Sequence, residues 1–314
     1  MIKQFFFITG LPKTGSTWIK NMLNDVNGIC CIGEGLFFAS GLKNTPSLYD
    51  SIYKSIYQWG DYICDRKQNW LDDLVEIKTI EKRNFVSEDN KTSVTQKIAD
   101  QATREIVLNC FLRQKAGTTA IGDKTTALST EVFPRIQRVF PEAKIIFLHR
   151  NLYDFLASYI MHFYRSTKTN RADAEMCRFT INDFLMIDSY QTNETSDIIT
   201  AKTLKKLIHD WKCMKIEFEK YKSNNHRVLA LQYEDIKSDP VKYFSKIVQF
   251  IDPHSDVDKC QGIIKNWSFD SKNMSTGPLK THVNSRITGY GKAMFSENLQ
   301  NIIEEELSRL SSKI

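Results

Sequence analysis

The sequence lacks any long apolar run. A helix that crosses a bilayer needs about 18 or more consecutive apolar residues, and no such stretch occurs in the 314 residues. The first apolar run begins at residue 5, is short, and leads directly into a glycine-containing loop, unlike a secretory leader. We therefore expect neither a membrane span nor a signal peptide.

Patterns of metal ligands and disulfides are missing as well. The seven cysteines are scattered, with Cys30 and Cys31 adjacent, and none of them has the spacing of a zinc site or of a disulfide framework. Free thiols are typical of a reducing compartment. The sequence therefore predicts a cytoplasmic protein that holds no metal.

A concentrated basic run is also absent. Lys and Arg number 43 against 37 Asp and Glu, which gives a net charge of +6 spread along the chain. This mild excess favours a small anionic ligand over a nucleic-acid surface, although a merely basic surface fits it equally. The length suffices for one large α/β domain, and nothing in the sequence indicates an oligomeric state.

What the sequence does contain is a strand, a tight loop and a helix near its N-terminus. The apolar residues Phe5 to Ile8 predict a buried strand, and Gly10 and Gly15 interrupt regular structure. Apolar residues at helical spacing then predict a helix over residues 16–26, namely Trp18, Ile19, Met22, Leu23 and Val26. The loop between the two elements carries a lysine and several hydroxyls.

Such a loop is suited to binding an anion. Backbone N–H groups at a helix N-terminus point outward, and the helix dipole favours negative charge there. Glycine admits close approach of a phosphate, whereas a plain strand-to-helix turn, the alternative, needs no lysine or hydroxyls. The pattern is not the nucleoside-triphosphate loop G-x-x-x-x-G-K-[ST], because Ser16 follows Gly15 and the lysine stands earlier, at Lys13.

The run Pro12-Lys13-Thr14-Gly15-Ser16-Thr17-Trp18 resembles the 5′-phosphosulfate loop of sulfotransferases that use PAPS (3′-phosphoadenosine 5′-phosphosulfate). The resemblance implies that this loop cradles the 5′-phosphate and that Lys13 binds the bridging and leaving oxygens. It also implies that Trp18 stacks on adenine, although a tryptophan at a helix start can equally belong to the core.

A glutamate between two glycines follows the next predicted strand, residues 29–32. Ligands of open parallel sheets bind beyond the carboxyl ends of strands, which is where Glu34 falls. Some members of the resembling family place a catalytic glutamate at this point. A solvated loop carboxylate is the alternative.

The segment Gly122-Asp123-Lys124-Thr125 resembles a family segment whose lysine lies near the transferring sulfuryl group. In the cytosolic sulfotransferases a catalytic histidine stands two residues after this lysine, where this chain has Thr126. Threonine cannot serve as a general base near neutral pH. We therefore expect Glu34 to be the base, with Asp123 and His162 in reserve.

The 3′-phosphate site of the family is matched by Arg150, at the end of a predicted buried strand, and by Ser158 on the helix after it. An arginine there can fork onto a phosphate, and a surface ion pair is the alternative. The family's closing loop is matched by Gly289 and Lys292, but Gly291 replaces its common tryptophan and Asn284-Ser285 its usual Arg-Lys pair. We expect Arg286, one or two positions further on, to compensate for that pair.

Residues 39–118 look largely helical, and the resemblance implies that they form the acceptor pocket. One helix is predicted by Tyr49, Ile52, Tyr53, Ile56 and Tyr57, and another by Ile98, Ala102, Ile106 and Leu108. The stripe Tyr49, Tyr53, Tyr57 and Trp59 either lines a pocket or belongs to the core. Residues 165–200 are polar and form either a lid or a solvated excursion.

The rest of the chain predicts further alternating elements. We expect helices at 129–140, 153–159, 203–221 and from Pro240 to Phe250, strands at 143–150 and 227–232, and a final helix capped by Ser296. The resemblance thus spans nearly the whole chain. It implies a single α/β sulfotransferase domain over 1–314, with a central parallel sheet flanked by helices in a P-loop-like fold.

The expected function is transfer of a sulfuryl group from PAPS to a hydroxyl or amine of a small-molecule acceptor, with Glu34 as base and Lys13 and Lys124 stabilising charge. The acceptor cannot be read from the sequence. The product would be PAP (3′,5′-adenosine bisphosphate), and no metal, nucleic acid or membrane partner is expected. Two alternatives stay open: a P-loop kinase of a small molecule that uses Mg-ATP, and a non-catalytic PAP-binding protein.

Overall fold

A five-stranded parallel sheet organises the protein. The computed structural model describes residues 4–39, 46–58, 88–112, 117–168, 201–222, 226–267 and 291–311. The sheet has the strand order β2-β3-β1-β4-β5, and its strands are β1 (Gln4–Gly10), β2 (Ile29–Gly33), β3 (Ala120–Lys124), β4 (Lys144–His149) and β5 (Val228–Gln232). Every neighbouring pair is parallel. The predicted fold class, a central parallel sheet flanked by helices, is confirmed.

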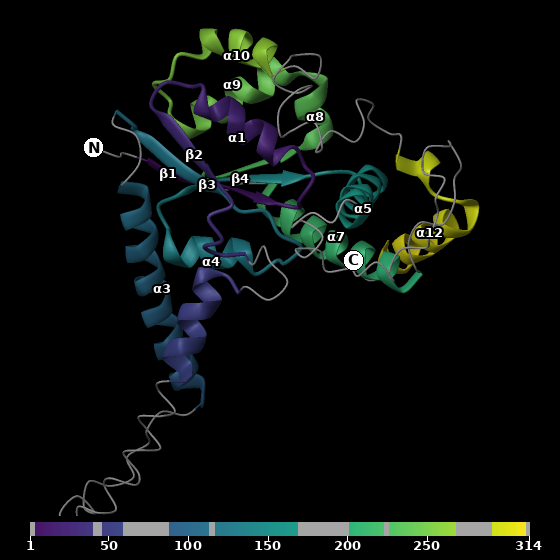
Figure 1. Cartoon of the computed structure of the whole chain (residues 1–314), viewed down its shortest axis with the longest axis horizontal. Helices are drawn as coiled ribbons and strands as arrows, with labels where there is room; N and C mark the ends of the chain where they lie inside the picture. Colours follow the sequence, from purple (N-terminus) through teal and green to yellow (C-terminus); the bar gives the residue numbers. More distant parts are fainter. Residues whose placement is uncertain are drawn as a thin grey trace, which may run out of the picture.

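Alternating side chains of the central strand β1 pack into two separate hydrophobic cores. Phe5 and Phe7 face one side of the sheet, and Phe6 and Ile8 face the other, as the two-residue period of a strand requires. Both faces are covered by helices (Figure 1). A strand buried on both faces is expected to be apolar throughout, and this explains the continuous apolar run near the N-terminus.

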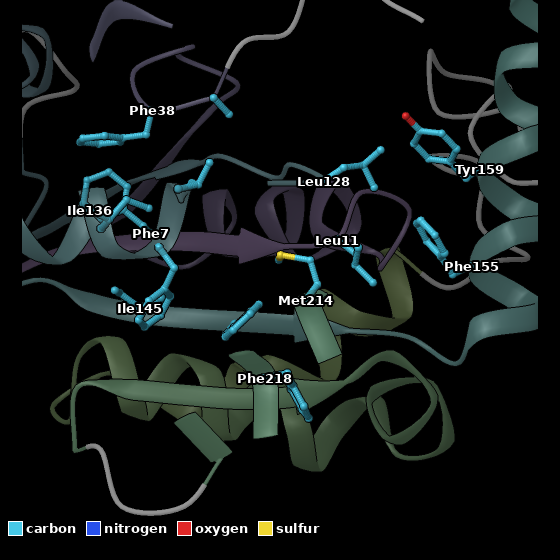
Figure 2. Packing of buried hydrophobic residues seen from close by; sticks show 14 of the residues in the cluster. Phe7, Leu11, Phe38, Leu128, Ile136, Ile145, Phe155, Tyr159, Met214 and Phe218 are labelled. Carbon is cyan, nitrogen blue, oxygen red and sulfur yellow. The ribbon is translucent and has the colours of Figure 1, made fainter. Parts of the chain in front are cut away.

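One face of the sheet is covered by α1 (Ser16–Asn24), α8 (Tyr233–Ser238), α9 (Pro240–Ile251) and α10 (Cys260–Asn266). The other face is covered by α3 (Glu88–Leu112), α4 (Val132–Val139), α5 (Leu152–Lys168), α7 (Ala201–Lys222) and α12 (Glu297–Ser311). Figure 2 shows Phe7, Phe38 and Ile136 gathered in this second core. Two short 3₁₀ helices, η3 (Val257–Lys259) and η5 (Gly291–Met294), and a helix over residues 48–58 are also present.

The long helix α3 buries a different face from the one predicted. Ile98 and Ile106 are 48% and 42% exposed. The buried positions instead recur every four residues, at Thr95, Ala99, Thr103, Val107 and Phe111. Small side chains on this face suit close packing on α4, where Arg104 on α3 donates to the carbonyl oxygen of Val139 at 2.7 Å.

The tyrosine stripe of helix 48–58 belongs largely to the core. Tyr49 is 3% exposed and Tyr53 packs against the same cluster. The rings of Tyr49, Tyr53 and Tyr57 stack in succession, with centroids 6.4 Å apart. The core alternative therefore holds for Tyr49 and Tyr53, while Trp59 lies outside the described residues.

The two predicted helix starts near the C-terminus are confirmed. The side chain of Asp239 accepts from the backbone N–H of Lys242 and thereby caps α9, with Pro240 in the first turn. The hydroxyl of Ser296 accepts from the backbone N–H of Leu299 at 3.3 Å and caps α12. The segment 165–200, the candidate lid, lies outside the described residues apart from the end of α5.

Candidate functional site

The loop between β1 and α1 is held in a conformation that needs glycine. Gly10 has a φ of +116°, and a Cβ there would lie 2.0 Å from the carbonyl oxygen of Leu148. Thr14 is buried and donates its hydroxyl to the carbonyl oxygen of Leu11 at 2.7 Å. Lys13 adopts a left-handed φ of 66°, which costs a non-glycine residue about 1–3 kcal/mol.

The N-terminus of α1 presents free donors. Gly15 is the N-cap, no side chain caps the helix, and its first turn holds no acidic residue. The first intrahelical bond runs from the N–H of Ile19 to the carbonyl of Gly15 at 3.0 Å. The backbone N–H groups of Ser16 and Thr17 precede this bond and point out of the helix start, and both residues add hydroxyls there. This is the geometry of an anion site.

Trp18 packs in the core. It is 5% exposed, and its indole Nε1 donates to the carbonyl oxygen of Trp267 at 2.9 Å. The structure thus shows the core packing that the sequence left as one alternative, while stacking on adenine stays a prediction.

Glu34 and Lys124 meet beside this loop. Their strands are neighbours, with Gly33 paired to Lys124 in the register, and the Nζ atom of Lys124 donates to Oε1 of Glu34. The same Nζ lies 3.4 Å from the hydroxyl of Thr17. The side chain of Glu34 is 54% exposed and that of Lys124 only 6%, so the carboxylate is accessible while the ammonium is held beneath it.

The turn that carries Glu34 is strained. Glu34 and Leu36 both have left-handed backbones, with φ of 54° and 53°. Its shape is fixed by two bonds to the end of β3: the N–H of Glu34 donates to the carbonyl of Lys124, and the N–H of Gly35 donates to Oδ1 of Asp123, both at 3.0 Å. Non-glycine residues persist in this region only where their surroundings hold them.

Asp123 is fully buried at the same place. Burial raises the pKa of this carboxyl from 3.8 to about 6, against the opposing effects of the Gly35 hydrogen bond and the charge of Lys124. Its Oδ2 atom is buried and has no hydrogen-bond partner among the described residues. The other reserve base, His162, lies on α5 and is half-buried.

Arg150 lies directly after β4, the neighbour of β1. Its Nη1 donates to the carbonyl oxygen of Lys13 at 2.9 Å, and its guanidinium lies 4.5 Å from the ring centroid of Tyr233. The Nε atom is buried without a hydrogen-bond partner within the described part of the chain. Oε1 of Glu234 lies 4.0 Å from this Nε, too far for a hydrogen bond. A buried N–H without a hydrogen bond is costly, and an anionic ligand would satisfy it.

Tyr233 is a site residue that sequence reasoning missed. It is 6% exposed, and a Cβ on Gly15 would lie 2.7 Å from its ring, so this tyrosine packs against both the loop between β1 and α1 and Arg150. The available signal was its position directly after β5, at the carboxyl edge of the sheet. The next residue, Glu234, has a structural role here, because its Oε1 accepts from the backbone and side-chain N–H groups of Asn151.

The closing segment is anchored near the start of α5. The N–H of Gly291 donates to Oδ1 of the buried Asp154 at 2.9 Å, and a Cβ on Gly291 would lie 2.3 Å from the carbonyl oxygen of Tyr153. A tryptophan at this position, as in the family, would therefore not fit. Lys292 is exposed, with its Nζ 3.7 Å from Oε1 of Glu304.

The remaining predicted residues are only partly placed. Ser158 is 5% exposed on α5, two turns beyond the helix start. Arg286 and Gly289 lie outside the described residues. The loop residues Lys13 to Thr17, with Glu34, Lys124 and Arg150, all come from the carboxyl edge of the sheet.

The described residues contain neither a cluster of metal ligands nor a membrane-spanning helix. No group of three or more His, Cys, Asp or Glu side chains in this part of the chain is arranged to hold a metal ion. No helix among the described segments is both long enough and apolar enough to cross a bilayer.

Comparisons with known proteins agree with this geometry. A family model described as "Sulfotransferase family" matches residues 6–256. No curated protein matches in sequence. Retinol dehydratase in complex with retinol and PAP is 12% identical, with a TM-score of 0.50 over 98% of this chain and 81% of that one. Mouse sulfotransferase SULT7A1 complexed with PAP is 15% identical, with a TM-score of 0.48 over 98% and 84%.

Proposed function

This chain belongs to the sulfotransferase family, and from that premise we propose that it moves a sulfuryl group from PAPS to a hydroxyl or amine of a small-molecule acceptor. The proposal includes Lys13, Glu34 and Lys124 as catalytic residues. PAP is bound in the retinol dehydratase structure that shares the fold, and we extend that cofactor class to this chain.

The observation that carries the proposal is a pair of anion-binding features on adjacent strands. The N-terminus of α1, which no side chain caps, follows β1. Arg150 follows β4, and its buried Nε makes no hydrogen bond among the described residues and lies 4.0 Å from Oε1 of Glu234. β1 and β4 are hydrogen-bonded neighbours, with Gly10 opposite Leu148. A ligand with two separate phosphates, such as PAP, matches two such features better than a ligand with a single phosphate does.

The residues present fit the binding of this ligand. The N–H groups of Thr14 to Thr17, with the hydroxyls of Ser16 and Thr17, would hold the 5′-phosphate, and Arg150 with Ser158 the 3′-phosphate. When bound, PAPS supplies an activated sulfuryl group with PAP as its leaving group. Arg286, Gly289 and Lys292 complete the proposed cofactor site from the closing loop.

The chain's own groups would supply positioning and charge. Lys13 and Lys124 place positive charge where negative charge develops, in a site that costs little reorganisation. Glu34 is exposed enough to reach the acceptor and take its proton, and its bond to Lys124 fixes the orientation of the carboxylate. An acceptor that is already a neutral amine needs this base less.

The cellular setting is part of the same proposal. The described cysteines Cys30, Cys31, Cys110, Cys213 and Cys260 are free thiols, as a reducing cytoplasm keeps them. We propose that residues 39–118 supply the acceptor pocket within a single domain over 1–314.

A direct transfer assay tests this function. The protein is incubated with PAPS and a panel of phenols, alcohols and amines, and release of PAP is measured with and without each acceptor. Acceptor-dependent release of PAP, with a sulfated product identified by mass spectrometry, is the expected result. ATP-dependent phosphorylation of the same acceptors, with no use of PAPS, would overturn the proposal in favour of a kinase.

A further inference from the structure

The strained turn at residues 33–37 needs an external support, and the structure shows where it comes from. Two of its residues, Glu34 and Leu36, are left-handed without being glycine. Its central amide, the N–H of Gly35, donates to a side chain from another strand, the carboxylate of Asp123. That side chain is fully buried at the end of β3.

We propose that Asp123 is a positioning residue of the transfer reaction, whose carboxylate holds the Glu34 turn so that Glu34 faces Lys124 and the acceptor. This inference rests on the proposed function, since it assigns a support to the base of that reaction. Asp123 itself takes no proton from the acceptor.

Exposure separates the two carboxylates. The Glu34 side chain is 54% exposed, whereas Asp123 has an exposure of 0%. A general base must come within hydrogen-bond reach of the proton it removes, and Asp123 lies below the turn, with Oδ1 already accepting from Gly35. Its buried position suits support of the turn and not contact with an acceptor.

The register of the sheet fixes the position of Asp123 relative to the Glu34 turn. Asp123 is paired with Phe7 in β1 and with Ile32 in β2, so its backbone is fixed from both sides. The next residue is Lys124, whose carbonyl accepts from the N–H of Glu34 and whose Nζ donates to the Glu34 carboxylate. Two consecutive residues of β3 therefore determine both the backbone and the side chain of Glu34.

Burial disfavours the charged form of Asp123 and raises its pKa to about 6. A neutral side chain of the same shape, asparagine, is therefore a close substitute. Its carbonyl oxygen can still accept from Gly35, but it cannot act as a base.

The test compares Asp123→Asn, Asp123→Ala and Glu34→Gln with the wild-type protein. For each we would measure kcat and KM with PAPS and an acceptor found in the transfer assay, and the melting shift with PAP. We expect Asp123→Ala to lower kcat by about 10²-fold, the scale of a misplaced catalytic group, with the PAP shift retained. Asp123→Asn should restore most of the wild-type kcat, while Glu34→Gln stays impaired.

Asp123→Asn decides the question even if Asp123→Ala fails to fold. An Asp123→Asn protein that binds PAP but is as inactive as Glu34→Gln would overturn the inference, because it would make Asp123 the base or a required charge. Full activity of Asp123→Ala would overturn it as well. Absence of PAPS-dependent transfer by the wild-type protein is a different outcome, which contradicts the proposed function itself.

Discussion

The guanidinium of Arg150 donates from Nη1 to the carbonyl oxygen of Lys13 at 2.9 Å, which joins two loops 137 residues apart in the sequence. Lys13 has a left-handed backbone, and its carbonyl is turned toward the arginine by that conformation. Arg150 therefore holds the loop between β1 and α1 with one nitrogen, while its Nε makes no hydrogen bond among the described residues and lies 4.0 Å from Oε1 of Glu234.

Replacement of Arg150 should weaken PAP binding more than loss of a single contact would. A charge-assisted hydrogen bond contributes about 1.5–3 kcal/mol, so we expect Arg150→Ala to raise the Kd of PAP at least about 10-fold. Arg150→Lys keeps the charge but loses the planar fork, and should fall between Arg150→Ala and the wild type. Isothermal titration calorimetry gives all three values.

Adenosine 5′-phosphosulfate, which lacks the 3′-phosphate, tests which phosphate Arg150 contacts. The wild-type protein should prefer PAPS over this analogue, and Arg150→Ala should lose much of that preference. Arg309→Ala, which removes an exposed arginine paired with Glu305 on α12, serves as the control and should change neither value. An unaltered preference in Arg150→Ala would show that the 3′-phosphate binds elsewhere.

Glu34→Gln should impair chemistry without impairing cofactor binding. Loss of a general base costs about 10²–10⁴-fold in rate, so kcat with a hydroxyl acceptor should fall within this range while the PAP melting shift is kept. Glu131→Gln, at the exposed N-cap glutamate of α4 that pairs with Arg135, is the matched control. Full turnover by Glu34→Gln with a hydroxyl acceptor would refute the assignment of the base.

Gly10→Ala should destabilise the fold strongly. An alanine would have to adopt a φ of +116°, and its Cβ would clash with the carbonyl oxygen of Leu148 at 2.0 Å, so we expect a loss of at least about 3 kcal/mol in the free energy of unfolding. Gly262→Ala in α10, where a Cβ would meet nothing within 4 Å, should instead be neutral or stabilising by about 0.5–1 kcal/mol. Urea denaturation of both variants measures the contrast, and equal stability would contradict it.

His149 should make the protein sensitive to acid. Burial, with a smaller contribution from Lys215, lowers the pKa of His149 from 6.5 to about 3, and its ring is packed beside Trp211 and Phe218. Below pH 6.5 the unfolded chain binds a proton that the folded chain does not, so this group lowers the free energy of unfolding as pH falls from 6.5 toward 3. The slope is about 1.4 kcal/mol per pH unit.

The variant His149→Phe isolates this contribution. Phenylalanine does not titrate, so the stability of the variant should fall less steeply than that of the wild type over the same pH range. The slope is the measurement, because a constant offset from the larger ring does not change it. Parallel curves for the two proteins would show that His149 is already protonated in the fold.

The sequence predicted the elements whose local signals are strong. Short apolar runs identified β1, β4 and β5, and caps such as Asp239 and Ser296 marked helix starts that the structure confirms. The site loop was found because glycine, lysine and hydroxyls occur together there for a chemical reason.

Elements that depend on distant partners were missed. β3 is only five residues long, with the sequence Ala-Ile-Gly-Asp-Lys, and its burial comes from β1 and β2 on either side. No local pattern marks such a strand. The buried face of α3 was misjudged for the same reason, because threonines and an alanine pack against α4 while the isoleucines Ile98 and Ile106 are exposed.

Contacts between residues far apart in the sequence could not be predicted from it either. The sequence suggested Arg150 as a phosphate ligand, but not its bond to Lys13. The sequence also suggested Glu34 and Lys124 separately, and only the pairing of β2 with β3 brings the two into contact. The support of Gly35 by Asp123 follows from that same pairing.

The central claim is that the site binds PAP, the nucleotide that remains when PAPS has given up its sulfuryl group. Thermal unfolding in the presence of PAP tests this claim most directly. A ligand that binds only the folded state raises its stability by mass action, by about 2.7 kcal/mol at 100 times the Kd. We predict that PAP alone raises the melting temperature by several degrees, and that a chelator leaves this shift unchanged. A shift that requires ATP with magnesium, and no shift with PAP, would contradict the account.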